Sequence, residues 1–556
     1  MVDFLIPAIV IAAAMALSWP LGQYLRWAMD PHQPGSLRQR EEMFHALLLG
    51  PGSTCGQSWR AYCRSMLVFN VVMFVFVYVV LTTQQWLPLN PDGKQNLEPS
   101  LAFNTAASFT CNTNLQHYSG EVSLSYFSQL CALMWLQFVS AATGIAAVTA
   151  LSRGLAGRPT LGNFFEDVWR ATGFVLLPVS LIWAVLLVLC GVPMTLQGAA
   201  VATTLEGVTQ TIARGPVAAF VAIKQLGTNG GGWFGPNGTH PFENPTFWSN
   251  VLCNLAIVLI PMATVWMFGR ITNRLQHAAV VFGVMLTLYL GFVGSACWLE
   301  SRPTAALAGL PVERSMNLEG KELRFGATAG ALWAVSTTAT SNGSVNAMHD
   351  SLNPLTGLLP MAGMWLNVVF GGVGVGLINL FVFVVTAVFL SGMMVGRTPE
   401  YLTRKLETKE MKLALVALLA HPLFILGGTA LFASTSWGME TLNNPGSHGL
   451  SEIIYEFSSA AANNGSGFEG LGDNTVPWNI ATGLVMLLGR FLPIIAPLAI
   501  AGALAAKRAA PESAGTFRTD TLLFGIVLLG TILIVGALLF LPLAMLGPIA
   551  EHLATG

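Results

Sequence analysis

Four short polar segments, rich in glycine and asparagine, recur along a chain that is otherwise strongly apolar. In order they are loop 1, CNTNLQ (111–116), loop 2, GTNGGG (227–232), loop 3, ATSNGS (339–344), and loop 4, ANNGSG (462–467). Taking Asn114, Gly230, Gly343 and Gly465 as equivalent points, the loops are separated by 116, 113 and 122 residues. Glycine permits dihedral angles closed to other residues, so such loops can turn carbonyl oxygens inward, and a ring of carbonyls can replace the hydration shell of a monovalent cation. The pattern predicts a cation selectivity filter made from four loops.

A semi-apolar stretch of about 12 residues, too short to cross a bilayer, precedes each loop. These stretches are 101–110, 217–226, 327–338 and 452–461. As re-entrant helices they would aim their negative C-terminal ends at one point. Irregular backbone is tolerated at membrane depth only where it is buried in protein or lines a water-filled path, and four loops around one axis meet that condition. Two alternatives stay open for the loops: ordinary turns, and glycosylation acceptors at Asn237, Asn342 and Asn464.

The composition of the chain is that of a membrane protein. It has 556 residues, of which 53% are hydrophobic and 10% are charged, whereas an ordinary soluble domain has about 25% charged residues. A soluble globular class is therefore excluded. The net charge of −1 leaves no basic excess to bind nucleic acid. The seven cysteines include no C-x-x-C pair, so they indicate neither a disulfide framework nor a zinc site.

Ten apolar stretches are long enough to cross a bilayer as helices, which takes about 20 residues each. They are 4–29, 66–87, 124–151, 168–192, 247–268, 277–299, 364–395, 411–433, 478–505 and 522–546. We therefore predict an all-α polytopic membrane protein in contact with membrane lipid. It would contain four pseudo-repeats of span, pore helix, filter loop and span, with one extra span at each end. The predicted units are an extra N-terminal span (1–30), repeats at 63–151, 166–269, 276–396 and 409–506, and an extra C-terminal span (520–547).

The distribution of basic residues predicts the orientation of the chain. Of the 26 Lys and Arg residues, 17 fall in the loops after the odd-numbered spans and 7 in the loops after the even-numbered spans. Basic residues near span ends are retained on the cytoplasmic side. Both termini and the four polar loops are therefore expected outside.

Two features within the spans have a functional and a structural interpretation. Arg490 lies in the middle of the ninth span, where a charge is costly. It either repels a passing cation below the filter or locks two helices through a salt bridge or carbonyl contacts. The seventh span contains GGVGVG (371–376), whose glycines either interrupt the helix to form a gate or allow close helix packing through Gly372 and Gly376.

Several motifs together resemble one family of potassium transporters. They are NTNLQHYSGE (112–121), LGTNGGGWF (226–234), HPFENP (240–245), AMHDS (347–351), GRTPEYL (396–402) and the segment ANNGSG of loop 4. This set is similar to the potassium-translocating A subunit of the bacterial Kdp potassium-transporting P-type ATPase. That family is related to the Trk and Ktr potassium transporters. The resemblance implies an inner-membrane subunit that selects and translocates potassium.

The resemblance also implies which residues bind the ion. The filter residues would be Asn112, Thr113, Asn114 and Gln116 in loop 1, Thr228, Asn229 and Gly230 in loop 2, Ser341, Asn342 and Gly343 in loop 3, and Asn463, Asn464 and Gly465 in loop 4. It favours a gate at Gly371, Gly372, Gly374 and Gly376, with Arg490 beside the pore. The sequence departs from the usual pattern at Asn342, where cysteine is expected, and at Leu115, Trp233 and Ala462. Selectivity at the level of Asn342 is the property that these departures affect most.

Motifs that would allow the chain to drive transport by itself are missing from the sequence. It has no G-x-x-x-x-G-K-[ST] loop and no D-K-T-G sequence, so we expect no bound nucleotide and a non-catalytic subunit. The resemblance implies a P-type catalytic B subunit with small C and F subunits as partners. A self-sufficient potassium channel or symporter subunit of the Trk and Ktr type is the alternative. An intramembrane metal hydrolase using His240, Glu243, His349 and Asp350 is a second alternative, although no H-E-x-x-H motif is present.

Overall fold

The computed structural model describes residues 4–30, 55–304, 316–394, 398–509 and 517–555, with a few single residues between these ranges. Arg397 of the GRTPEYL motif lies outside them. Within the described residues, ten helical segments are long and apolar enough to cross a membrane. They are α1 (Leu5–Met29), α3 (Trp59–Thr83), α6 (Trp135–Leu155), α7 (Phe164–Arg170) continuing into α8 (Leu177–Leu189), α10 (Phe247–Ile271), α11 (Leu275–Glu300), α14 (Val375–Met394), α15 (Thr408–Ala433), α18 (Val476–Ala505) and α19 (Leu522–Ala544). The predicted all-α polytopic fold is confirmed.

Shorter elements connect these spans. A helix precedes each of the four loops, namely α4 (Pro99–Thr110), α9 (Val217–Leu226), α12 (Ala327–Ala339) and α17 (Gly446–Ala462). The remaining described α-helices are α5 (Gly120–Ser123), α13 (Pro354–Leu366), α16 (Ser436–Met439) and α20 (Ala550–Thr555). The described strands form two antiparallel hairpins, β1 (Ala200–Thr203) with β2 (Thr209–Ile212) and β3 (Glu400–Tyr401) with β4 (Arg404–Lys405).

Local capping explains where several helices begin. The Ser58 hydroxyl accepts a hydrogen bond from the Ala61 amide at the start of α3. The Glu98 carboxylate caps α4, and proline follows it in the first turn, where a missing amide hydrogen costs nothing. Thr246 and Ser249 form a reciprocal capping box at the start of α10. These caps set where the re-entrant helix α4 and the spans α3 and α10 begin.

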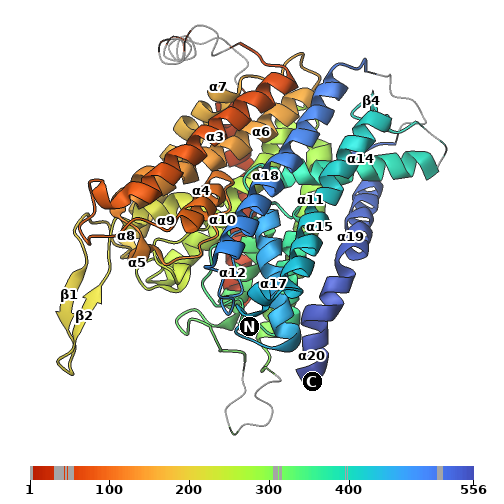
Figure 1. Cartoon of the computed structure of the whole chain (residues 1–556). Coiled ribbons are helices and arrows are strands. Elements are labelled where there is room, and N and C mark those ends of the chain that lie inside the picture. Colours follow the sequence, from red (N-terminus) through yellow and green to blue (C-terminus); the bar gives the residue numbers. More distant parts are fainter. Residues whose placement is uncertain are drawn as a thin grey trace.

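The two ends of the molecule differ. Figure 1 shows both termini at the end that carries the β1–β2 hairpin, whereas β4 lies at the opposite end. Helices α6, α10 and α14 are mostly buried, whereas most residues of α8, α15 and α19 are exposed or only partly buried. An apolar outer surface is expected where helices contact lipid tails instead of water.

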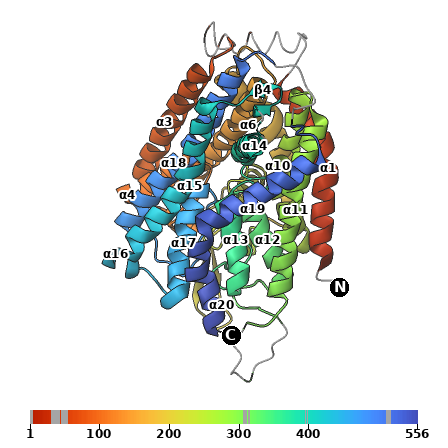
Figure 2. The same ribbon diagram turned by 90° about the vertical axis from the view of Figure 1, so that its right-hand side faces the viewer.

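The seventh predicted span is divided into two helices. Helix α13 ends at Leu366, residues 367–374 are irregular, and α14 begins at Val375. Figures 1 and 2 show α14 running across the direction of the neighbouring spans. Figure 2 also shows α19 inclined to that direction. Residue 376, which we predicted to lie in the interruption, belongs instead to the first turn of α14. A left-handed residue at Asn367 ends α13, because an asparagine tolerates this conformation better than most residues.

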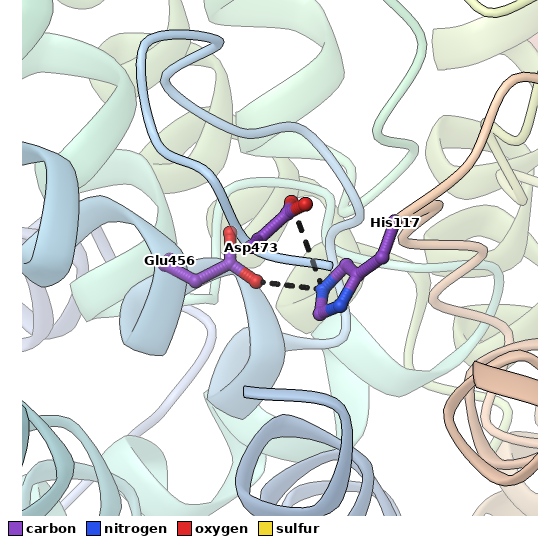
Figure 3. Close-up of side chains that lie close together, drawn as sticks. All are labelled: His117, Glu456 and Asp473. Atoms are coloured by element: carbon purple, nitrogen blue, oxygen red, sulfur yellow. Dashed lines mark hydrogen bonds and ion pairs between the residues drawn. The ribbon is translucent and has the colours of Figure 1, made fainter. Parts of the chain in front are cut away.

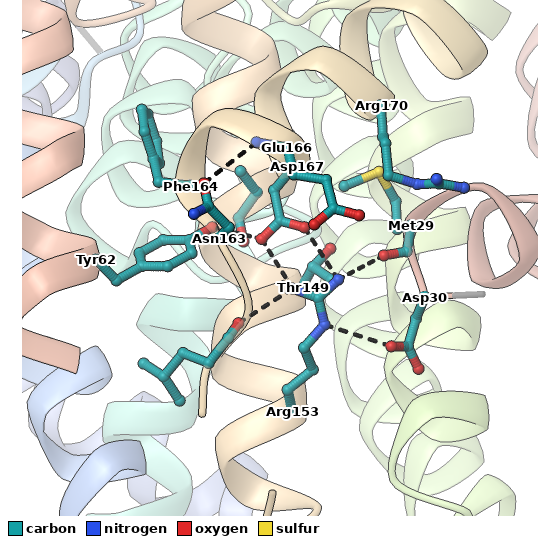
Figure 4. A network of polar contacts seen from close by, with 12 residues as sticks. Met29, Asp30, Tyr62, Thr149, Arg153, Asn163, Phe164, Glu166, Asp167 and Arg170 are labelled. Carbon is teal, nitrogen blue, oxygen red and sulfur yellow. Dashed lines mark hydrogen bonds and ion pairs between the residues drawn. The ribbon is translucent and has the colours of Figure 1, made fainter. Parts of the chain in front are cut away.

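A buried charged network joins four elements at the β4 end (Figure 4). The Arg153 guanidinium donates two hydrogen bonds to the Asp167 carboxylate, at 2.8 and 3.0 Å, and one to the Met29 carbonyl at 2.6 Å. The Tyr62 hydroxyl donates to Asp167 at 2.9 Å, and Asp30 accepts from Arg153 at 3.4 Å. Because every buried charge here has an opposite charge and several hydrogen bonds, the network fixes α1, α3, α6 and α7 relative to one another.

Candidate functional site: four convergent loops

The same backbone hydrogen bond closes each of the four loops. In each, the amide of one residue donates to the carbonyl five residues earlier, at the end of the preceding short helix, with N–O distances of 2.7–2.9 Å. We call these donors the middle residues; they are Thr113, Asn229, Asn342 and Asn464, and their acceptors are Ser108, Lys224, Thr337 and Ser459. The repeat that the sequence predicted is therefore present in the backbone geometry of the loops.

The residues on either side of each middle residue have left-handed backbone conformations. The pairs with positive φ are Asn112 and Asn114, Thr228 and Gly230, Ser341 and Gly343, and Asn463 and Gly465. This φ pattern is costly for residues other than glycine and asparagine, yet the chain adopts it four times. Alternation of left-handed and right-handed φ turns successive carbonyl groups to the same side of the chain, unlike the alternating carbonyls of a β-strand.

Contacts between the loops close a ring. A Cβ atom added to Gly230 would collide with the Asn342 carbonyl of loop 3, and one added to Gly343 would collide with the Asn464 carbonyl of loop 4. A Cβ on Gly465 would collide with the Thr113 carbonyl of loop 1. Loop 1 returns to loop 2, because a Cβ on Gly231 would lie 2.8 Å from the Asn114 Cβ. Each loop therefore meets the next, and the fourth meets the first.

The carbonyls of the four middle residues form an unpaired ring. All four residues are at most 1% exposed, and the described residues donate no hydrogen bond to their carbonyl oxygens. The residues just before and just after the middle residues do not form further rings of unpaired carbonyls. In loop 2, the Thr228 carbonyl accepts from Asn112 at 2.8 Å and the Gly230 carbonyl accepts from Asn237 at 2.6 Å. A buried unpaired carbonyl is costly in free energy. Four of them on one axis can coordinate a dehydrated monovalent cation.

Asparagine side chains tie successive loops together. The Asn342 amide group donates to the Lys224 carbonyl at 3.2 Å, and the Asn464 amide group donates to the Thr337 carbonyl at 2.8 Å. Each of these asparagines thus binds the end of the short helix of the preceding repeat. Asn342, the main departure from the family pattern, makes the same contacts as Asn464, including acceptance of the amide of the serine two residues later. It braces loop 3 through its side chain, and its carbonyl belongs to the ring.

A buried ion pair stands behind loop 2. The Lys224 ammonium on α9 pairs with the Glu243 carboxylate and donates to the Asn237 side-chain oxygen at 2.5 Å. The Asn237 amide group in turn donates to the Gly230 carbonyl at 2.6 Å, and Glu243 accepts from the Phe234 amide at 3.0 Å. Glu243 of the HPFENP motif therefore supports the loop from behind and does not face the ring.

Loop 1 is the one loop of the four without glycine. Asn114 occupies the position of the glycines and is 1% exposed, and neither polar atom of its side chain has a hydrogen-bond partner among the residues that the structure describes. The Gln116 side chain is engaged, because it donates to the Gly232 carbonyl of loop 2 at 3.0 Å and to the Tyr118 hydroxyl at 3.2 Å and accepts from the Gly232 amide at 2.7 Å. The Asn114 amide group therefore breaks the fourfold symmetry of the loops on the side of loop 1.

The irregular segment between α13 and α14 is bonded to three of the loops. The Asn367 side chain accepts from the Ser341 hydroxyl at 2.9 Å and donates to the Ala462 carbonyl at 3.3 Å. The Val373 amide donates to the Thr228 hydroxyl at 2.9 Å. Residues 367–374 therefore lie directly against loops 2, 3 and 4.

Arg490 lies next to this segment. It is 3% exposed and donates to the Ser140 carbonyl at 3.3 Å, and no carboxylate among the described residues lies within ion-pair distance of it. A Cβ on Gly372 would lie 3.6 Å from the Ser341 Cβ and 3.8 Å from an Arg490 nitrogen, so the segment separates loop 3 from the guanidinium. Of the two structural interpretations of Arg490, the salt bridge is absent from the described residues and the carbonyl contact is present.

The glycines of the segment allow close backbone contacts. Gly371 and Gly374 have positive φ values of 37° and 82°. Gly371 packs against the backbone of Gly376, and a Cβ on Gly374 would collide with the Gly144 carbonyl of α6. Gly372 and Gly376 do not share a helix face, because α14 begins between them.

Three residues that support the loops were not among those predicted from the sequence. Asn237 binds the Gly230 carbonyl, Asn367 binds loops 3 and 4, and the Ser140 hydroxyl donates to the Asn112 side chain at 2.8 Å. Asn237 precedes a glycine, and Asn367 interrupts an apolar run shortly before two glycines, which is typical of a turn. Ser140 lies within an apolar span and carries no comparable signal.

The four residues considered for a metal hydrolase do not form one site. The Glu243 carboxylate is bound to Lys224, and His240 stacks on Phe234 with the ring centres 3.8 Å apart. His349 contacts the Tyr455 hydroxyl at 2.8 Å, and burial lowers the pKa of His349 to about 3. Asp350 lies 3.0 Å from His448. The four side chains therefore do not converge on one metal ion or one water molecule.

Comparisons with known proteins identify one family. Residues 8–553 match the family described as potassium-transporting ATPase A subunit, KdpA. The chain is 48% identical over 545 residues to the potassium-transporting ATPase potassium-binding subunit of Geobacillus kaustophilus (strain HTA426), covering 97% of each chain. A solved structure of the potassium transporter TrkH from Vibrio parahaemolyticus is similar over 86% of this chain and 97% of that one, with a TM-score of 0.49 and 14% identity. The chain belongs to the potassium-transporting ATPase A subunit family.

Proposed function

We propose that this chain binds potassium in the ring formed by the middle residues and passes it to a catalytic partner subunit. The observation that carries the proposal is the ring of four buried carbonyl oxygens without hydrogen-bond donors. Removing water from a cation is costly, and carbonyl oxygens replace that water at a fixed geometry. The ends of α4, α9, α12 and α17 add partial negative charge near the same axis. Potassium is the transported ion in this account and not a resident cofactor.

Family membership supports an ATP-driven complex over a self-sufficient channel or symporter. The energy would come from a P-type ATPase B subunit, with small C and F subunits completing the complex. The charge distribution supports an orientation in the bacterial inner membrane with the four loops and both termini on the outer side. The chain would be organised as repeats at 63–151, 166–269, 276–396 and 409–506, with extra spans at 1–30 and 520–547.

The irregular segment at 367–374 would form a gate on the side of the ring where Arg490 lies. The Asn367 side chain is bonded to loops 3 and 4 and the Val373 amide to loop 2, so a change in ion occupancy of the loops reaches the segment directly. Arg490 places a positive charge beyond it without a carboxylate partner among the described residues. Such a charge would repel a cation that leaves the ring straight through the membrane, and so divert the ion toward the partner.

Two glycines of loop 4 provide a matched test of the ring. A Cβ on Gly465 would collide with the Thr113 carbonyl, and the φ of Gly465, 105°, is unfavourable for any other residue. A Cβ on Gly467 would lie 3.8 Å from its nearest atom. In the assembled complex, we expect Gly465→Ala to raise the potassium concentration for half-maximal ATPase activity at least about tenfold, which corresponds to roughly 1.4 kcal/mol. It should also reduce discrimination between potassium and rubidium. Gly467→Ala should match the wild type, and an unchanged Gly465→Ala variant would contradict the proposal.

A further inference from the structure

Three ionisable side chains meet just outside the ring, between repeats 1 and 4 (Figure 3). His117 follows loop 1, Glu456 lies on α17, and Asp473 lies in the segment after loop 4. The His117 Nε2 atom lies 3.2 Å from the Glu456 carboxylate and 3.7 Å from the Asp473 carboxylate. The His117 and Glu456 side chains are buried, whereas the Asp473 side chain is 27% exposed, which leaves a route from solvent.

The orientation of the imidazole is fixed from its other side. The His117 Nδ1 atom lies 2.7 Å from the Asn479 side-chain oxygen. The Asn479 amide nitrogen is held by the Ser100 hydroxyl at 3.1 Å and by the Asn474 oxygen at 3.3 Å, so the oxygen must face the histidine. Nδ1 therefore carries a hydrogen. Nε2 is directed toward the two carboxylates and donates a hydrogen to them when no metal is present. A metal ion would take the place of that hydrogen, while the hydrogen bond from Nδ1 to Asn479 keeps the ring in the orientation of a metal-binding histidine.

We propose that His117, Glu456 and Asp473 form a binding site for a divalent transition-metal ion of the zinc type. Zinc takes nitrogen and carboxylate ligands at about 2.0–2.2 Å in a tetrahedral arrangement, which places neighbouring ligand atoms roughly 3.4 Å apart. The two distances from Nε2 lie on either side of that value. All three ligand atoms lie within 4.8 Å of one another. Water would supply the fourth ligand.

The chemistry of the three ligands selects against other cations. Calcium requires six to eight oxygen ligands, and magnesium retains several of its waters. An imidazole nitrogen with two carboxylate oxygens suits zinc and its neighbours in the first transition series. Because the three ligands come from repeats 1 and 4, a bound ion would join the two repeats beside the contact between Gly465 and Thr113.

A second histidine cluster provides a matched control. His448 lies 3.0 Å from Asp350 through Nε2 and 2.8 Å from Glu551 through Nδ1. The two carboxylates therefore face opposite ring nitrogens, so an ion on either nitrogen would lose one of them, whereas both carboxylates of the first cluster face Nε2 of His117. Glu452 also lies within 4.8 Å of Asp350 and His448, so the control tests whether this second cluster contributes to zinc binding. His448→Gln makes the same chemical change as His117→Gln in a similarly acidic setting.

Zinc titration of the purified full-length chain tests the site, with a chromophoric chelator as competitor. We expect one zinc ion per chain in the wild type and in His448→Gln. The affinity should fall at least about tenfold in His117→Gln and Asp473→Asn, and about 10- to 100-fold in Asn479→Ala, which removes the orienting hydrogen bond. Failure of the wild type to bind zinc, as expected if a proton is the only occupant, would overturn the proposal. So would unchanged binding in His117→Gln, or an equal loss in His448→Gln.

X-ray absorption at the zinc edge tests the site without any substitution, and so does not depend on how well a variant folds. The zinc-loaded wild type should show one imidazole and a shell of nitrogen and oxygen at about 2.0–2.2 Å. A sulfur shell at about 2.3 Å would assign the metal to a cysteine, and more than one imidazole would assign it to another histidine set; either result overturns the proposal.

Discussion

Loops 2 and 4 have the same backbone geometry but are supported by different chemistry. In loop 4 the support is neutral: the Ser459 hydroxyl on α17 accepts from the Gly465 amide at 2.9 Å, and the Asn464 side chain accepts from the Ser466 amide at 3.0 Å. In loop 2 the corresponding helix position is Lys224, whose ammonium is buried with the Glu243 carboxylate. Loops 1 and 3 also have a hydroxyl at this position, Ser108 and Thr337. Loop 2 is therefore the exception.

The difference shows that a fourfold ring of carbonyls does not require fourfold side chains. Each loop needs only its own hydrogen bonds, and repeat 2 obtains them from an ion pair and Asn237. A buried ion pair contributes little net stability compared with well-packed apolar residues, but loss of one partner leaves an uncompensated charge. Loop 2 is therefore expected to be more sensitive to single substitutions than loop 4.

Among the substitutions that test this difference, Lys224→Met should have the largest effect on stability and activity. It leaves the Glu243 carboxylate buried without its partner, which costs roughly 3–5 kcal/mol. We expect a large loss of thermal stability in detergent, together with loss of potassium-dependent ATPase activity in the complex. The double variant Lys224→Met with Glu243→Gln removes both charges and should regain most of the stability. Equal stability of the single and double variants would contradict the assigned ion pair.

Asn237→Ala tests the link between the ion pair and loop 2. It removes the hydrogen bond to the Gly230 carbonyl and one of the partners of the Lys224 ammonium, at a cost of roughly 1–3 kcal/mol. Ser459→Ala in loop 4 removes one neutral hydrogen bond, which contributes roughly 1 kcal/mol. The potassium concentration for half-maximal ATPase activity should rise more in Asn237→Ala than in Ser459→Ala. The reverse order would show that loop 4, and not loop 2, depends more on its support.

The smallest predicted effect concerns pH and lies away from the loops. Burial disfavours the charged form of His448, but the carboxylates of Asp350 and Glu551 outweigh it and raise the pKa of His448 to about 10. The unfolded value is about 6.5. The stabilisation is therefore complete below pH 6.5 and is lost as the pH rises toward 10. The melting temperature of the wild type should exceed that of His448→Gln by roughly 1–3 °C at pH 6 and by less at pH 9.5. A constant difference would contradict the pairing.

The fold and the position of the loops were predictable from the sequence because both depend on local patterns. Apolar runs identify spans, and the nearly regular spacing of Asn114, Gly230, Gly343 and Gly465 identifies the repeat. The structure adds relations between distant residues. That the Asn342 side chain contacts the short helix of the preceding repeat, and that α14 runs across the bundle, follow from tertiary packing. No local pattern encodes which polar side chain of one repeat meets the backbone of the next.

The supporting residues were harder to predict than the loops themselves. Glu243 belongs to a motif that we noticed, yet its partner Lys224 lies within an apolar helix and is easily taken for a membrane-end anchor. Asn367 acts through a left-handed conformation that ends α13, and the sequence shows only an asparagine before a glycine-rich stretch. Such residues function through geometry, which spacing alone does not determine.

Anomalous diffraction from crystals grown with thallium, a potassium substitute, would locate the bound ion. We expect a peak on the axis enclosed by the carbonyl oxygens of Thr113, Asn229, Asn342 and Asn464, and loss of that peak in Gly465→Ala but not in Gly467→Ala. A saturated crystal with no peak at this level, or with its strongest peak away from the four loops, would contradict this expectation.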